Sequence, residues 1–120
     1  MKKVLIVDDE PDILRVITFR LKKAGYEVFT AENGQSALDL IYANKPDLIL
    51  LDLRMPIMSG DVVCAKIKKD NALKDIPIIL LTASSGAKNA ENIKAIETDD
   101  YLIKPFEPEV LLEKVKKWIK

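Results

Sequence analysis

The sequence predicts an α/β fold in which one mostly parallel sheet is covered by helices on both faces. Its 120 residues contain four short runs of consecutive apolar residues, the pattern of strands that are buried on both faces of a parallel sheet. The segments between these runs repeat their apolar residues with a helical period. Strands that alternate with helices in this way imply parallel pairing and right-handed crossovers.

Five segments are expected to form the strands. The continuous apolar runs at residues 4–7, 48–51 and 78–81 are the strongest, and residues 101–103 form a weaker one. Residues 26–30 alternate between apolar and polar side chains, which favours a strand at the edge of the sheet.

The first predicted helix begins at Pro11 and ends near Gly25. Proline suits the first helical position, because its missing N–H would have no partner there, and glycine suits the end. The residues expected to face the core are Ile13, Val16, Ile17 and Leu21.

Four further helices are expected after the other strands. Asn33-Gly34 and Ser59-Gly60 mark the starts of two of them, residues 88–97 form a shorter and more polar one, and Pro108 opens the last. Their expected inward residues are Ala37, Leu38 and Ile41; Val62, Val63 and Ile67; and Val110, Leu111, Val115 and Trp118.

Length and composition restrict the possible functions. Five strand–helix units use the whole chain, so one domain is expected over residues 1–120. The chain has no histidine, which excludes Ser-His-Asp and Cys-His catalysis, and its single cysteine, Cys64, is expected to be a packing residue. The 19 Lys+Arg and 19 Asp+Glu residues balance, which argues against a nucleic-acid surface. Without a membrane-spanning run or signal peptide, a cytoplasmic protein is expected.

Polar residues follow four of the predicted strands. Ligands of open parallel sheets bind beyond the carboxyl ends of the strands, where the strand order reverses. In a five-stranded, flavodoxin-like, doubly wound sheet of order 2-1-3-4-5, this point lies between the first and third strands. Asp8 and Asp9 follow the first strand, Asp52 the third, Thr82 the fourth and Lys104 the fifth. We therefore expect these side chains to converge on one edge.

This set of side chains has a definite chemistry. Three crowded carboxylates repel one another and raise each other's pKa, which a divalent cation would relieve. Mg²⁺ is favoured, because it binds one or two carboxylates and keeps positions for water and phosphate oxygens. A metal, a carboxylate nucleophile and a lysine together predict phosphoryl transfer to an aspartate.

Four motifs at the ends of successive strands resemble the receiver domain of two-component response regulators, over essentially the whole chain. The resemblance is to the single-domain, chemotaxis-regulator-like type. The motifs are Asp8-Asp9, Asp52-Leu53-Arg54-Met55-Pro56 with Gly60, Thr82-Ala83, and Tyr101-Leu102-Ile103-Lys104-Pro105-Phe106.

The resemblance implies a phosphorylation-activated signalling switch that catalyses only its own phosphorylation and dephosphorylation. Asp52 would accept a phosphoryl group from a sensor histidine kinase or a histidine phosphotransfer protein. Asp9 and Asp52 would bind Mg²⁺ directly together with the backbone carbonyl of Arg54, and Asp8 would hold a metal-bound water. Lys104 would neutralise a phosphoryl oxygen.

The resemblance also implies how the signal leaves the site. Thr82 would hydrogen-bond the phosphoryl group, and Tyr101 would change rotamer with it. A downstream protein would then bind the face formed by the fourth helix, fifth strand and fifth helix. Arg54 and Ser84 would tune the lifetime of the phosphoryl group. Neither direct nucleic-acid contact nor membrane insertion is expected.

Two local features bear on this resemblance. The peptide before Pro105 is usually cis in similar domains, and an X-Pro bond permits that isomer. Similar domains often carry a Gly-Ala pair where this chain has Glu97-Thr98. Glycine at that point would end the fourth helix in a left-handed conformation, so its absence leaves the end of that helix open.

Three other functions were considered. A phosphatase of the haloacid dehalogenase type needs a second carboxylate where Arg54 stands, two residues after the nucleophile. A flavodoxin-like flavin carrier needs a phosphate-binding loop after its first strand, whereas residues 8–12 are mostly acidic. A degenerate receiver, which acts only as an interaction module, typically lacks the phosphoacceptor or the lysine, and Asp52 and Lys104 are both present.

Overall fold

A five-stranded sheet of order β2-β1-β3-β4-β5 forms the middle layer of the structure, and each neighbouring pair of strands is parallel. The structure is a computed structural model that describes residues 1–53, 57–83 and 98–119. Fold class and strand order agree with the sequence prediction. The strands are β1 (Lys3–Val7), β2 (Glu27–Ala31), β3 (Leu48–Asp52), β4 (Ile78–Ala83) and β5 (Asp100–Lys104).

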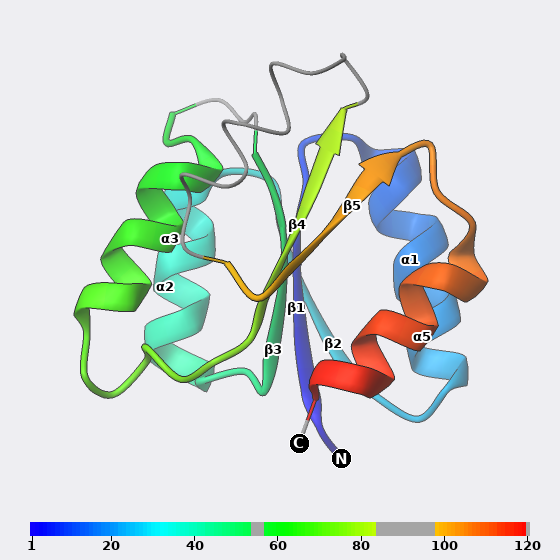
Figure 1. The fold of residues 1–120 in the computed structure, drawn as a ribbon, viewed down its shortest axis with the longest axis horizontal. Coiled ribbons are helices and arrows are strands. Elements are labelled where there is room, and N and C mark those ends of the chain that lie inside the picture. Colours follow the sequence, from blue (N-terminus) through cyan, green and yellow to red (C-terminus); the bar gives the residue numbers. More distant parts are fainter. Residues whose placement is uncertain (54–56, 84–97, 120) are drawn as a thin grey trace.

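Helices cover both faces of this sheet (Figure 1). Helices α1 (Pro11–Lys23) and α5 (Pro108–Trp118) lie on one face, and α2 (Gly34–Asn44) and α3 (Gly60–Lys69) lie on the other. The helix predicted for residues 88–97 lies outside the described residues. Within the described ranges, no helix is long and apolar enough to cross a membrane.

The sheet separates two hydrophobic cores. Successive strand residues point to opposite faces, so a continuous apolar run supplies both cores at once. In β1, for example, Leu5 and Val7 belong to one core and Val4 and Ile6 to the other. The first core also contains Ala37, Leu38, Ile41, Val63, Cys64 and Ile67 from α2 and α3, and the second contains Leu14, Ile17, Leu21, Leu111 and Val115 from α1 and α5.

The helix ends follow the signals in the sequence. The Asn33 side chain accepts a hydrogen bond from the backbone N–H of Ser36 at 2.8 Å, which caps α2. Pro11 and Pro108 begin α1 and α5 as predicted. Gly25 follows α1 with a φ of +96°, a left-handed conformation that side chains other than glycine rarely adopt.

Three of the residues predicted to face the core are instead partly exposed. Val16, Val62 and Val110 have exposed fractions of 51%, 41% and 40%. Each lies one position before a buried residue, and successive helical residues differ by about 100° in direction, so both cannot face the sheet equally. In α1 the buried stripe runs through Leu14, Ile17 and Leu21.

Strand β5 also differs from the prediction of a strand buried on both faces. Leu102 is 5% exposed, whereas Tyr101 and Ile103 are 45% and 46% exposed. The reason is the position of β5 at the end of the sheet, where β4 is its only neighbouring strand. One face of β5 is covered by α5 and its core, and the other presents Tyr101 and Ile103 to solvent.

Two adjacent aspartates fix the start of β5. The Asp99 side chain accepts a hydrogen bond from the backbone N–H of Ile78 at 2.8 Å. The Asp100 side chain accepts from Nζ of Lys114 and from Nε1 of Trp118, both at 2.9 Å. Burial alone would raise the pKa of Asp100, but the hydrogen bonds from Lys114, Trp118 and the Tyr101 N–H outweigh it and hold the pKa below its usual value of 3.8.

We therefore predict that Asp100→Asn lowers the free energy of unfolding near neutral pH by about 1.5–3 kcal/mol, the usual contribution of a hydrogen bond to a charged group. A carboxyl whose pKa is lowered by folding stabilises the protein above its unfolded pKa. That contribution is lost as the pH falls through the folded pKa. Urea denaturation between pH 7 and pH 2 should show the wild type and the variant converging at the acid end. A constant difference across this range would contradict the assignment.

Candidate functional site

Four strands bring polar side chains to the carboxyl edge of the sheet. Asp8 follows β1 directly, Asp52 ends β3, Thr82 is the second-to-last residue of β4, and Lys104 ends β5. In a parallel sheet all carboxyl ends lie at the same edge, and the order β1-β3-β4-β5 places these four strands side by side. The predicted convergence of these residues is thus seen in the structure.

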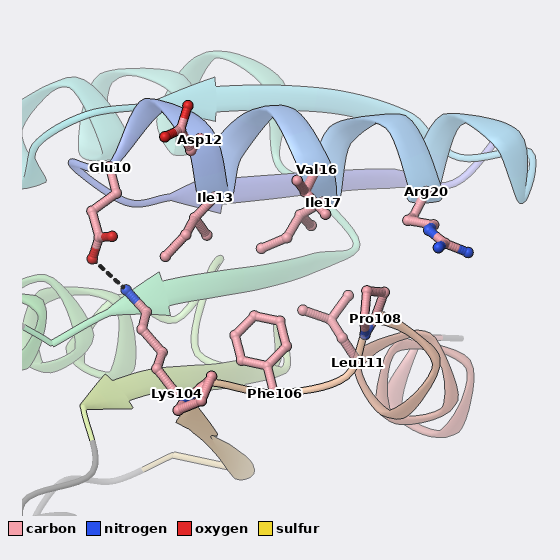
Figure 2. A pocket seen from close by; sticks show the side chains of 11 residues that line it. Glu10, Asp12, Ile13, Val16, Ile17, Arg20, Lys104, Phe106, Pro108 and Leu111 are labelled. Atoms are coloured by element: carbon pink, nitrogen blue, oxygen red, sulfur yellow. Dashed lines mark hydrogen bonds and ion pairs between the residues drawn. The ribbon is translucent and has the colours of Figure 1, made fainter.

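The Lys104 ammonium group lies among three carboxylates. Its Nζ is 2.7 Å from Oδ2 of Asp8, 3.4 Å from Oε1 of Glu10 and 3.5 Å from Oδ2 of Asp52. Figure 2 shows the contact between Lys104 and Glu10. The peptide bond between Lys104 and Pro105 is cis, as the family resemblance implies.

The surroundings of Lys104 shift its pKa upward. Burial alone would lower the pKa of the ammonium group, but the hydrogen bond to Asp8 and the negative charges of Asp52, Asp8 and Glu10 raise it above the usual 10.5. Because folding raises the pKa of Lys104, these ion pairs stabilise the fold at every pH below the pKa that Lys104 has in the unfolded chain. The stabilisation is lost only as the pH rises through the folded pKa. Lys104 is therefore a cation throughout the physiological range.

Two of the carboxylates at this edge are almost fully buried. Asp8 is 0% exposed and Asp52 is 6% exposed, whereas Asp9 is exposed. A buried carboxylate is stable only with a cation or hydrogen-bond donors nearby. Lys104 contacts one oxygen of Asp8, and the backbone N–H of Glu10 donates to the other at 2.9 Å.

The same edge has a donor set that suits a hard cation. One carboxylate oxygen from each of Asp8, Asp9 and Glu10 lies within 4.8 Å of the others. Oxygen ligands of this kind fit Mg²⁺. Glu10 is a member that the sequence prediction missed. Asp52 lies 3.5 Å from Nζ of Lys104, which also contacts Asp8 and Glu10 of this set. The predicted ligand carbonyl of Arg54 lies outside the described residues.

The two residues of the predicted switch share one face of the sheet. Thr82 is 2% exposed and pairs with Ile103 of β5. Tyr101 pairs with Leu80, which lies two positions before Thr82 in β4. Side chains of paired residues, and of residues two apart along a strand, point to the same face. Thr82 and Tyr101 thus both lie on the face of α2 and α3, to which Leu80 contributes. Ser84, predicted to tune the phosphoryl lifetime, lies outside the described residues.

An apolar groove opens beside Lys104, between α1 and the start of α5 (Figure 2). It has a volume of about 650 Å³. Ile13 and Val16 line it from α1, and Phe106 and Leu111 line it from the opposite side. Its position explains why Val16 is half exposed, because this side chain faces the groove and not the core.

Comparisons with known proteins point to one family. The family model described as the response regulator receiver domain matches residues 4–116. The phosphate regulon transcriptional regulatory protein PhoB of Pseudomonas aeruginosa is 44% identical over 115 residues, which cover 96% of this chain and 50% of PhoB. The chain spans about half the length of the curated relatives it matches.

Solved structures give the same result. The receiver domain of the sensor histidine kinase PA1611 from Pseudomonas aeruginosa, with a magnesium ion in its active site cleft, has a TM-score of 0.90 at 31% identity and covers 98% of this chain and 96% of its own. The Vibrio cholerae chemotaxis protein CheY4 has a TM-score of 0.90 at 34% identity and covers 99% of each chain.

These similarities decide between the functions considered above. They favour a receiver domain over a phosphatase of the haloacid dehalogenase type and over a flavin carrier. They do not support the expectation that the protein makes no direct contact with nucleic acid, because PhoB is named a transcriptional regulatory protein.

The ion pairs of Lys104 are expected to differ in strength. Lys104→Met leaves the buried Asp8 carboxylate without its cation, so we predict a loss of about 3 kcal/mol in unfolding free energy. Glu10→Gln is the matched control on the same ammonium group. The Glu10 side chain is 59% exposed, so Glu10→Gln should lower the free energy of unfolding by less than about 0.5 kcal/mol. Chemical denaturation near neutral pH without divalent ions measures both, and equal losses would contradict this ranking.

Proposed function

The chain belongs to the response regulator receiver domain family, and on this premise we propose that Asp52 is the residue that accepts a phosphoryl group. Receiver domains are signalling switches of two-component systems that are phosphorylated on an aspartate, and they pair with histidine kinases. The observation that supports Asp52 is its place at the end of β3, 3.5 Å from the Lys104 ammonium group.

The proposed reaction is a direct phosphoryl transfer from a phosphohistidine of a sensor kinase or phosphotransfer protein. A carboxylate oxygen of Asp52 forms a bond to phosphorus while the bond from phosphorus to the histidine nitrogen breaks, and the bonding electrons return to that nitrogen. The Lys104 ammonium group, held by Asp8, offsets the negative charge on the phosphoryl oxygens. The same residues would serve the later hydrolysis, in which a water oxygen forms a bond to phosphorus while the bond from phosphorus to the Asp52 oxygen breaks, which returns the carboxylate and releases inorganic phosphate.

The reaction as proposed needs Mg²⁺. Asp8, Asp9 and Asp52, with the backbone carbonyl of Arg54, would hold it, and the acidic edge that includes Glu10 supports this assignment. The bound ion would neutralise phosphoryl oxygens and offset the repulsion between them and the carboxylates.

The proposed output begins at Thr82. Its hydroxyl group would donate a hydrogen bond to the phosphoryl group, and Tyr101, on the same face of the sheet, would change its conformation. Exposed Tyr101 and Ile103 lie on the surface where a downstream protein would bind, together with α5 and the fourth helix expected in this fold. Arg54 and Ser84 would tune how long the phosphoryl group remains.

The wider setting is also a proposal. We take residues 1–120 as one receiver unit, in a cytoplasmic protein. Similarity to the chemotaxis protein CheY4 would agree with a stand-alone, chemotaxis-regulator-like form, and similarity to PhoB, of which the match covers 50%, would agree with a receiver joined to a further domain. In the second form the output would be the control of that domain, and nucleic-acid binding would be its property.

Phosphorylation of Asp52 can be measured directly. Incubation with Mg²⁺ and a small acyl phosphate should add one phosphoryl group to the wild type, as seen by intact mass. Asp52→Asn should add none, because an amide cannot act as the nucleophile. Omitting Mg²⁺ should slow the wild-type reaction strongly.

Asp9→Asn provides the matched control, since it changes a neighbouring carboxylate without removing the nucleophile. It should weaken the binding of Mg²⁺, so that phosphorylation needs a higher Mg²⁺ concentration, while leaving Asp52 able to react once that concentration is reached. A wild type that gains no phosphoryl mass, or an unchanged gain in Asp52→Asn, would falsify the proposed function.

Thr82 should matter more for the output than for the transfer. Thr82→Ala should slow phosphorylation by about a hundredfold at most, since a hydrogen bond to a charged phosphoryl oxygen contributes roughly 1.5–3 kcal/mol. The change in the ring resonances of Tyr101 on phosphorylation, followed by NMR, should disappear. Thr82→Ser keeps the hydroxyl group and should restore the change in the Tyr101 resonances. An unaltered Tyr101 response in Thr82→Ala would refute this role.

A further inference from the structure

Helix α3 begins in direct contact with the backbone that carries Asp52. Gly60 is its first residue, and its N–H donates a hydrogen bond to the carbonyl oxygen of Leu53 at 2.9 Å. A Cβ atom at Gly60 would overlap the carbonyl oxygen of Asp52 and lie 2.9 Å from Cα of Leu53 and 3.1 Å from the carbonyl carbon of Asp52. Only glycine therefore fits at this point.

The chemistry of these contacts makes them hard to relieve. All three atoms that a Cβ would meet belong to the main chain of Asp52 and Leu53. A crowded side chain can rotate into another rotamer, but a main-chain atom moves only with its strand. Strand β3 is buried along its whole length between β1 and β4, so its end can move only by displacing Asp52 or by tilting α3.

A second glycine makes a close approach to the start of α3. Gly34 is the first residue of α2, and a Cβ there would overlap the carbonyl oxygen of Met58 and lie 2.6 Å from Cβ of Met58. Both helices of this face thus begin with a glycine in close contact with main-chain atoms, those of Asp52 and Leu53 for α3 and that of Met58 for α2.

We propose that Gly60, supported by Gly34, is a positioning residue for the phosphoryl acceptor, an inference that rests on the proposed role of Asp52. The bare Cα of Gly60 lets α3 begin against the end of β3. This contact fixes the main chain of Asp52, and thereby the place of its carboxylate 3.5 Å from Nζ of Lys104. A helix-starting residue is otherwise free to be alanine, which favours a helix more than glycine does.

The test uses glycine-to-alanine substitutions at three positions. Gly60→Ala adds a methyl group against Asp52 and Leu53, and Gly34→Ala adds one against Met58 and Val63. Gly25→Ala is the matched control, because its φ of +96° makes the substitution unfavourable, but no atom lies within 4 Å of the added Cβ. It therefore perturbs the fold away from the site.

Phosphorylation rates with Mg²⁺ and a small acyl phosphate are measured by intact mass at a temperature at which thermal melts show each variant to be folded. Gly60→Ala should react about ten to a hundred times more slowly than the wild type, since displacements below 1 Å can cost this much in a positioned reaction. Gly34→Ala should show a smaller loss, and Gly25→Ala should react at the wild-type rate. The amide NMR resonances of Asp52 and Leu53 should shift in Gly60→Ala and stay in place in Gly25→Ala.

Each other outcome counts against the inference. A folded Gly60→Ala that reacts at the wild-type rate overturns it, as does a loss in Gly25→Ala equal to that in Gly60→Ala. If Gly60→Ala does not fold, Gly34→Ala decides, and a wild-type rate there overturns the inference. If the wild type is not phosphorylated, both the proposed function and this inference are wrong. If the wild type is phosphorylated and Gly60→Ala reacts at the same rate, only the inference is wrong.

Discussion

The ion pair between Lys104 and Asp8 is the contact on which the polar edge of the sheet depends. The two residues are 96 positions apart in the chain and come from strands separated by β3 and β4. Asp8 is fully buried, and an unpaired carboxylate in such a place costs several kcal/mol. Lys104 supplies the compensating charge, and its long side chain reaches across from the edge strand to do so. The same nitrogen also faces Asp52, so one cation sets the electrostatics of both buried carboxylates.

The rest of the sheet makes this arrangement possible by being apolar elsewhere. Strand β3 is buried at every position and ends at Asp52, so its carboxylate follows directly on the core. The two cores hold the strands from both faces, and α3 closes onto the end of β3 through Gly60. A site assembled in this way gains its geometry from packing, because the main chain beneath each functional side chain is fixed by apolar neighbours.

The strands and the polar edge of the sheet could be predicted from the sequence because both depend on local patterns. Continuous apolar runs identified the strands, and the polar residue after each run identified the edge where Asp8, Asp52 and Lys104 meet. The helix faces were less certain, since adjacent apolar residues such as Val16 and Ile17 both fit a helical period, and only packing against the sheet separates them.

Other features have no local signal at all. Glu10 stands beside Asp8 and Asp9 in an acidic run, and its contact with Lys104 exists only because β5 ends where β1 ends. Gly60 was recognisable as part of a motif, but the reason for glycine lies in the carbonyl oxygen of Asp52, which only the folded chain brings to it.

The charge balance at this edge also determines how strongly phosphorylation can act. A phosphoryl group adds about −1.5 to −2 charges beside buried carboxylates. Lys104 already bonds Asp8 and contacts Glu10 and Asp52, so its bonds to phosphoryl oxygens replace existing contacts and do not simply add to them. A ligand shifts a two-state equilibrium only by the difference between its interaction free energies with the two states. Moving a population from 1:99 to 99:1 requires about 5.5 kcal/mol. The exchange at Lys104 contributes to this only the difference between its old and its new contacts. If Lys104 alone supplied the shift, the two conformations would therefore remain mixed in at least one of the two phosphorylation states.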